Sequence, residues 1–147
     1  MSFDTTNGTR GARQPRGLLL RLVNRLAARR ARGSDGDMLV LTTVGRKSGA
    51  ERANPLRGFP GPDGSWLVVA SAGGAAGNPG WYYNLGAHPD QVKVETGGRA
   101  VPVVAEQLHG AERDEAWQRI TAAAAQFANY QTKTDRELPI IRLTPKP

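Results

Sequence analysis

One short segment of the chain combines cations, a hydroxyl and glycines in a way that suits an anionic ligand. Residues 42–49 read Thr-Thr-Val-Gly-Arg-Lys-Ser-Gly, and Arg52 follows three residues later. Arginine presents a planar fork to phosphate or carboxylate oxygens, lysine adds a point charge, and glycine lets the backbone approach a ligand closely. Arg46, Lys47, Ser48 and Arg52 are therefore a candidate seat for a phosphate or polycarboxylate tail. A solvated hairpin turn is the alternative interpretation.

The composition excludes several other kinds of catalytic site. The chain of 147 residues contains no cysteine, which rules out disulfides, thiolate metal sites and cysteine nucleophiles. Its two histidines, His88 and His109, stand outside any cluster with ligand spacing, so we expect no metal site. The Gly-Arg-Lys-Ser turn also lacks the helix that opens directly after a nucleotide-binding P-loop.

The positive charge is concentrated at the N-terminal end. Residues 1–32 contain eight Arg and one Asp, whereas the rest of the chain contains twelve charged residues of each sign. Projected as a helix, residues 17–32 place most arginines on one side and leucines and alanines on the other, which predicts a basic amphipathic helix. Such a helix could lie on an anionic membrane, pack on the domain or contact nucleic acid. We favour the first two, because no basic patch elsewhere continues a nucleic-acid footprint.

These observations divide the chain into a basic arm, residues 1–36, and one domain, residues 37–147. We expect residues 1–15 to be disordered because they are polar and rich in Gly, Thr and Arg. The apolar run in the arm is too short to span a membrane and lacks the cleavage site of a secretory signal. The sequence thus favours a cytoplasmic protein, with peripheral contact to the inner face of the cell membrane through residues 17–32.

Beyond the arm, the pattern predicts a mainly β domain with flanking helices, in the α+β class. We expect a short helix to open at Asn78-Pro79 and to reach Leu85, and a longer helix with an acidic first turn to cover residues 111–127. This order favours a small closed or split β-barrel over a parallel doubly wound sheet. The strands are expected at residues 38–44, 52–59, 65–70, 91–95, 99–107 and 138–143.

Five motifs follow one another along the domain. They are Thr42-Thr43-x-Gly45-Arg46-Lys47-Ser48-Gly49, Arg52-x-Asn54-Pro55-Leu56, Val69-Ala70-Ser71-x-Gly73-Gly74, Asn78-Pro79-x-Trp81-Tyr82-x-Asn84-Leu85 and Tyr130-Gln131-x-Lys133-Thr134-x-Arg136-x-Leu138-Pro139. In this order they resemble the deazaflavin (coenzyme F420)-dependent nitroreductases of actinobacteria. The resemblance implies a split β-barrel of the flavin-reductase and pyridoxamine-oxidase type, and hydride transfer from C5 of reduced F420 to a bound acceptor.

The resemblance also implies a set of site residues. The cationic segment would bind the anionic tail of F420, and the small residues after the third strand would let its flat ring lie close to the backbone. Tyr130, whose hydroxyl would orient the acceptor or donate a proton, and Ser71 are the candidate catalytic residues. The residues expected to bind F420 are Arg46, Lys47, Ser48, Arg52, Asn54, Pro55, Ala70, Ser71, Gly73, Gly74, Pro79, Trp81 and Tyr82.

The expected acceptor is a small conjugated molecule, either a quinone such as menaquinone or a nitroaromatic compound. Because the cofactor carries the difficult chemistry, the absence of a catalytic triad from the sequence does not argue against an enzyme. Two alternatives share the same fold: a non-catalytic protein that binds F420, flavin or haem, and an FMN-dependent oxidoreductase. A homodimer is also expected, since related split barrels often dimerise.

Overall fold

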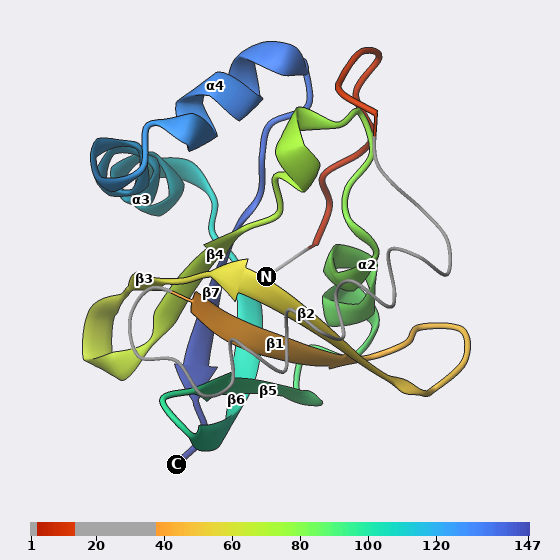
Figure 1. The fold of residues 1–147 in the computed structure, drawn as a ribbon, viewed down its shortest axis with the longest axis vertical. Coiled ribbons are helices and arrows are strands. Elements are labelled where there is room, and N and C mark those ends of the chain that lie inside the picture. Colours follow the sequence, from red (N-terminus) through yellow and green to blue (C-terminus); the bar gives the residue numbers. More distant parts are fainter. Residues whose placement is uncertain (1–2, 14–37) are drawn as a thin grey trace.

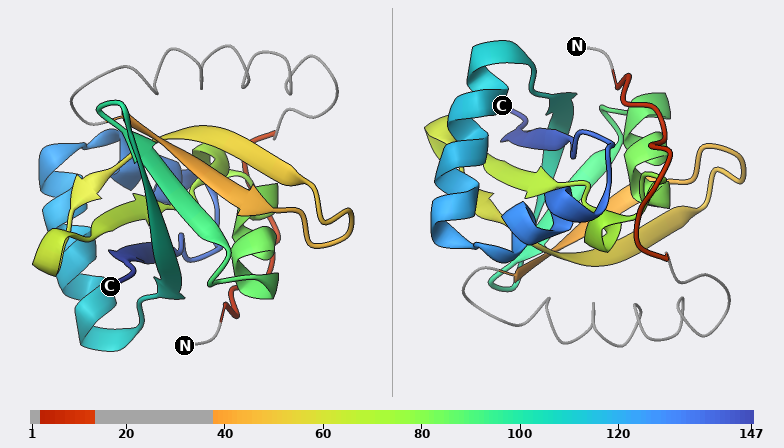
Figure 2. Two further views of the ribbon diagram at one scale, coloured as in Figure 1. Left: turned by 90° about the horizontal axis from the view of Figure 1, so that it is seen from below. Right: turned by 90° about the horizontal axis from the view of Figure 1, so that it is seen from above.

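The structure is a computed structural model that describes residues 3–13 and 38–147. Its seven strands are β1 (Met38–Val44), β2 (Glu51–Arg57), β3 (Phe59–Pro60), β4 (Trp66–Val69), β5 (Val92–Thr96), β6 (Arg99–Gln107) and β7 (Ile140–Pro145). They form one antiparallel sheet in the order β2-β1-β5-β6-β7-β4-β3. The sheet curls strongly (Figures 1 and 2), and Gly58 alone separates its two edge strands along the chain.

The helices lie on opposite sides of this curled sheet. Helix α2 (Gly80–Ala87) lies at one side, and α3 (Gly110–Ala123) with α4 (Gln126–Lys133) lies at the other (Figure 2). Two short 3-10 turns, η1 (Pro62–Gly64) and η2 (Ala72–Gly74), flank β4 in sequence. The arrangement confirms the predicted split β-barrel with flanking helices.

Strands β4 and β7 each contribute to two separate cores, because successive side chains of a strand point to opposite faces. Val68 and Ile141 pack in the cluster that contains Trp81 of α2. Ile140 packs in a second cluster, which contains Phe127 of α4. This double burial explains why β4 is apolar throughout and why β7 begins with two consecutive isoleucines, Ile140 and Ile141.

The single helix predicted for residues 111–127 is wrong. Ala124 departs from the helical conformation (φ −146°, ψ 87°) and separates α3 from α4. The alanine-rich sequence favours a continuous helix, but tertiary packing overrides that preference by bringing the ring of Phe127 to 5.7 Å from the ring of Phe59. Tyr130, which we expected after the helix, therefore lies inside α4.

The disorder predicted for residues 1–15 is also wrong where the structure describes them. Residues 3–13 run beside α2 and bind the domain through backbone hydrogen bonds from Gly8 to Ala76 (2.8 Å) and from Ala12 to Gly74 (2.9 Å). The close approach needs glycine, because a Cβ on Gly11 would collide with the amide of Ala76. We refer to residues 3–13 as the N-terminal strap.

The amphipathic helix predicted for residues 17–32 and the proposed boundary at residue 36 lie outside the described residues. Within residues 3–13 and 38–147, no helix is both long enough and apolar enough to cross a membrane. Membrane contact through the arm therefore stays a prediction.

Candidate functional site

The predicted cationic segment forms a tight turn between β1 and β2, which we call the cationic turn (residues 45–50). Its backbone is closed by hydrogen bonds from Gly45 to Ala50 (2.8 Å) and from Gly49 to Gly45 (2.9 Å). The side chains of Arg46 and Lys47 are exposed. Among the ion pairs of the described residues, none involves either side chain. The two cations thus keep their charge available for an anionic ligand.

Ser48 has a role inside the turn. Its hydroxyl oxygen accepts a hydrogen bond from the amide of Ala50 at 3.1 Å. A Cβ on Gly45 would lie only 2.7 Å from the same oxygen, so a larger residue at position 45 would force the Ser48 side chain to shift. The hydroxyl of Ser48 therefore stabilises the turn, whether or not it also contacts a ligand.

The cationic turn is attached to α2 by Asn84, a residue to which sequence reasoning gave no ligand role. The side-chain oxygen of Asn84 accepts a hydrogen bond from the amide of Arg46 (3.1 Å), and its nitrogen donates to the hydroxyl of Thr43 (3.1 Å). The guanidinium of Arg46 lies 4.6 Å from the centre of the Tyr83 ring. One signal in the sequence could have identified Asn84. It is an amide side chain on a short helix whose other inward-facing residues are apolar.

The predicted residues of β2 point to different faces of the sheet. Asn54 pairs with Leu41, which belongs to the core beneath α2, whereas Pro55 pairs with Val40, which packs against the opposite face. Arg52, two residues before Asn54, shares its face. Asn54 and Pro55, both predicted to bind F420, therefore cannot line the same face of the sheet. Proline is tolerated here because β2 is an edge strand.

The small residues after β4 form a second turn, residues 70–78, which we call the glycine turn. Gly73 and Gly74 both have positive φ angles, 64° and 85°. A Cβ on Gly74 would lie 2.5 Å from the carbonyl oxygen of Tyr130, whereas a Cβ on Gly73 would meet no atom within 4 Å. Gly74 is thus packed against α4, and Gly73 borders open space where a flat ligand could approach the backbone.

A buried arginine, Arg136, lies beneath the glycine turn. Its Nε and Nη2 donate to the carbonyl of Ala75 (3.1 and 3.0 Å), and Nη2 also donates to the carbonyl of Ser71 (2.9 Å). Its Nη1 donates to the carbonyl of Ala70 (3.0 Å) and to the side-chain oxygen of Asn78 (2.7 Å). Burial lowers the pKa of the guanidinium. Arg136 therefore binds the glycine turn and Asn78, and not the neighbouring carboxylate of Asp135.

The two predicted catalytic residues lie in the glycine turn (Ser71) and beside it (Tyr130). Tyr130 is half-buried, and its ring stands edge-on to Phe127 at 5.6 Å. Among the described residues, its hydroxyl has no hydrogen-bond partner. Ser71 is half-buried at the start of η2, and its carbonyl accepts hydrogen bonds from Arg136 and from Gly74. Tyr130 and the glycine turn are neighbours, because the backbone of Tyr130 packs against Gly74.

The residues at the start of α2 that were predicted to bind F420 are buried. Trp81 and Tyr82 both belong to the core, and Pro79 is buried at the start of the helix. The Tyr82 hydroxyl donates to Gln107 (2.5 Å) and accepts a hydrogen bond from the amide of Thr5 (3.0 Å). Burial raises the pKa of the Tyr82 hydroxyl. These residues support the site from inside the fold.

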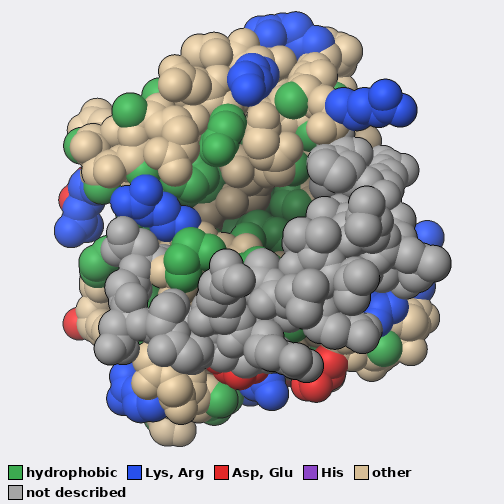
Figure 3. Space-filling view, viewed as in Figure 1, with side chains coloured by type: hydrophobic (Ala, Val, Ile, Leu, Met, Phe, Trp, Pro, Cys, Tyr) green, Lys and Arg blue, Asp and Glu red, His purple; other side chains and the backbone are tan. Residues whose placement is uncertain are grey.

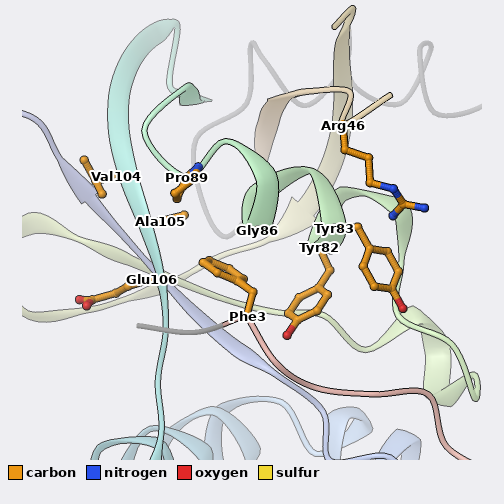
Figure 4. Close-up of a pocket in the computed structure, with 9 residues that line it drawn as sticks. All are labelled: Phe3, Arg46, Tyr82, Tyr83, Gly86, Pro89, Val104, Ala105 and Glu106. Atoms are coloured by element: carbon orange, nitrogen blue, oxygen red, sulfur yellow. The ribbon is translucent and has the colours of Figure 1, made fainter. Parts of the chain in front are cut away.

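A cavity of about 710 Å³ lies between α2 and β6 (Figure 4). Arg46 and Tyr82 are the two predicted site residues that line it. The cationic turn thus borders a cavity, whereas the residues of the glycine turn do not line this one. The lining consists of Phe3, Arg46, Tyr82, Tyr83, Gly86, Pro89, Val104, Ala105 and Glu106.

The space-filling view shows a second concavity on a different part of the surface. Below the part of the surface that carries α4 and η2 in this view, the surface is hollowed (Figures 1 and 3). Hydrophobic side chains lie toward its interior, and Lys and Arg side chains lie at several points of its margin. Such a hollow suits a flat apolar ring with an anionic extension.

Comparison with known proteins identifies the family. The sequence model of the F420H(2)-dependent quinone reductases matches residues 19–145. The chain belongs to this family. An F420H(2)-dependent quinone reductase of Mycobacterium tuberculosis is 37% identical over 109 residues, which cover 72% of each chain.

Solved structures agree with this F420H(2)-dependent quinone reductase assignment. An F420-H2-dependent reductase (FDR-A) is 38% identical and superposes with a TM-score of 0.68 over 75% of this chain and 96% of that chain. A protein described as a pyridoxamine 5′-phosphate oxidase from Listeria innocua is 13% identical and has a TM-score of 0.52 over 76% and 86% of the two chains, which concerns the fold alone. The predicted family, enzyme class and cofactor are thereby confirmed.

The described residues fit F420 on their own chemistry. The tail needs accessible positive charge, which Arg46 and Lys47 provide without carboxylate partners among the described residues. The ring needs a backbone that it can approach closely, which the open space at Gly73 provides. The comparisons do not test the individual site residues, so their roles belong to the proposal below.

Proposed function

We propose that this member of the family transfers a hydride from reduced F420 to a quinone. The observation that carries the proposal is the cationic turn, where exposed Arg46 and Lys47 have no carboxylate partner in the described chain and Asn84 fixes the backbone. When bound, reduced F420 supplies the hydride. The protein has to bind the anionic tail, orient the ring and acceptor, and deliver a proton.

Each of these tasks has a candidate residue. Arg46, Lys47 and Arg52 would bind the tail, and the open backbone at Gly73 would support the ring. The Tyr130 hydroxyl, which has no hydrogen-bond partner among the described residues, would orient the acceptor or donate the proton. Ser71, at the start of the same turn, would contact the ring or the acceptor.

A binding and turnover experiment tests this function. Intrinsic tryptophan fluorescence should be quenched by F420 and not by FMN, and reduced F420 should be oxidised on addition of a quinone. Binding of F420 without turnover would instead indicate a non-catalytic binding protein. Preference for FMN would refute the cofactor assignment, and full turnover in a Tyr130→Phe variant would remove the proton-donor role.

The tail seat has its own test. Replacing both Arg46 and Lys47 with Ala should weaken F420 binding by about 10- to 100-fold, with a loss that shrinks as salt increases, because exposed charges are screened. The control is the double replacement Arg99→Ala and Arg119→Ala, which removes the same charge from exposed positions elsewhere. Equal affinities of both variants and the native chain would refute the seat.

The finer acceptor assignment is menaquinone, reached from a membrane through residues 17–32. The amphipathic pattern of these residues supports contact with anionic lipid. Replacing Leu19, Leu22 and Leu26 with Ser in the full chain should abolish flotation with anionic liposomes. Unchanged flotation would refute the role of the arm.

A further inference from the structure

One guanidinium joins the two ends of the glycine turn. The carbonyls of Ala70 and Ser71 precede η2, and Ala75 and Asn78 follow it, yet all four accept hydrogen bonds from Arg136. The side chain is only 2% exposed, and all five of its N–H groups are used. The path of the turn between these acceptors is therefore set by a single side chain.

The positive charge of this guanidinium is surrounded by neutral groups. Its acceptors are three backbone carbonyls and one amide oxygen, and no ion pair within the described residues includes Arg136. The neighbouring carboxylate of Asp135 instead accepts hydrogen bonds from Thr9 and Arg10. Because a guanidinium stays protonated in proteins, a net positive charge persists beneath the turn.

Asn78 extends this arrangement to the strap and to α2. Its side-chain oxygen accepts from Arg136, which leaves its nitrogen to donate to the carbonyl of Thr5 (2.9 Å) and toward the hydroxyl of Tyr83 (3.4 Å). The orientation of the Asn78 amide is thus fixed at both ends, and the glycine turn is tied to two other parts of the fold.

We propose that Arg136 is a positioning residue that sets both the shape of the glycine turn and its attraction for an anionic ligand. The first effect acts through the carbonyls that it binds. The second acts through a buried charge, which is poorly screened by water and salt. The identity of the ligand, F420, rests on the proposed function. The effect of Arg136 on the shape of the turn does not.

Three variants separate the two effects. Arg136→Met removes the charge and the donors, and Arg136→Lys keeps the charge but has too few donors to join four acceptors. The matched control is Arg113→Met, since Arg113 is another buried arginine, which donates to the carbonyl of Leu138 and pairs with Glu137 without binding residues 70–78. Three quantities are measured for each variant: affinity for F420 at several salt concentrations, kcat with a quinone, and amide hydrogen exchange. The temperature is one at which circular dichroism shows that the variants are folded.

The affinity of Arg136→Met for F420 should fall about tenfold, which is the size of the Coulomb interaction between two unit charges about 10 Å apart at an effective dielectric constant of about 20. This loss should be nearly independent of salt, unlike that of the Arg46 and Lys47 variant. Arg136→Lys should keep its affinity within about threefold but lose kcat as Arg136→Met does, because it retains the charge without the geometry. Arg113→Met should change neither.

Several results would overturn the inference. They are undiminished affinity in Arg136→Met, an equal loss in Arg113→Met, or as large an affinity loss in Arg136→Lys as in Arg136→Met. If Arg136→Met does not fold, the Lys variant decides alone by its retained affinity and reduced kcat. If the native chain does not bind F420, the proposed function fails, and hydrogen exchange decides the inference: residues 70–78 should exchange faster in both Arg136 variants than in Arg113→Met, and equal rates would refute it.

Discussion

The cationic turn and the glycine turn are stabilised in opposite ways. The glycine turn is tied from beneath by a buried guanidinium and is packed against α4 at Gly74. The cationic turn depends on its own backbone bonds, on Ser48 and on Asn84, while Arg46 and Lys47 extend into solvent. The glycine turn is formed before any ligand arrives, whereas the cationic turn keeps side chains that can still adapt.

This difference suits the two ends of a long redox cofactor. Hydride transfer requires the reacting atoms to be oriented within a narrow range, so a rigid surface is useful beside the ring. A flexible polyanionic tail needs charge more than shape, and exposed cations provide it at little cost to folding. Substitutions in both turns and in the strap test the comparison.

The largest expected effect is on stability when each turn loses an arginine. Arg136→Met should lower the free energy of unfolding by about 3–5 kcal/mol, because buried carbonyls lose their donors. Arg46→Met should change it by less than about 0.5 kcal/mol, because the side chain is exposed. Urea unfolding measures both, and similar values for the two variants would contradict the contrast.

The two glycines of the glycine turn should differ from each other. Both Gly73→Ala and Gly74→Ala place a methyl group at positive φ, which costs about 1 kcal/mol. Gly74→Ala adds a clash with the carbonyl of Tyr130 and should cost about 2 kcal/mol more. Thermal unfolding of the two variants compares them, and an equal loss would show that α4 does not constrain the turn.

The attachment of the cationic turn should have a smaller effect. Asn84→Ala removes two hydrogen bonds of a half-buried amide and should cost about 1–2 kcal/mol. It should also weaken F420 binding, since the backbone at Arg46 loses its anchor. Asn129→Ala, at an exposed position on α4, is the control. Unchanged stability in Asn84→Ala would mean that the turn holds its position without α2.

The smallest expected effect is the loss of the strap's contact with Asp135 at low pH. Hydrogen bonds from the hydroxyl and amide of Thr9 lower the pKa of the Asp135 carboxyl to about 2. Because this pKa is lower in the folded chain than in the unfolded chain, the strap contact is fully present above about pH 4. It should be lost as the pH falls toward 2.

Titration of the Asp135 carboxyl by nuclear magnetic resonance measures its pKa directly. The amides of Thr9 and Arg10 should exchange faster below pH 3, where the contact is lost. Thr9→Val removes the hydroxyl donor, so the pKa of Asp135 should rise toward its usual value. A midpoint near the usual value in the native chain would contradict the structure of the strap.

Much of this site could be predicted from the sequence because it depends on local pattern. Alternating residues predicted β5 and β6, and the Gly-Arg-Lys-Ser-Gly sequence predicted the cationic turn between the first two strands. The motif order predicted the family, the fold and the cofactor. In each case a few consecutive residues specify a turn or a charge whatever surrounds them.

Other features were decided only by contacts between distant residues. The break at Ala124 depends on where Phe127 can pack, and the order of the strap depends on Ala76, Gly74 and Asp135, which lie more than 60 residues away. The buried position of Arg136 also required the tertiary structure, because a charged residue in a polar motif gives no local sign of burial. The sequence by itself determined which chemical groups are present and which turns they occupy. The tertiary structure decided which of those groups face a ligand and which support the turn from inside, because burial and long-range hydrogen bonding depend on the packing of the whole chain.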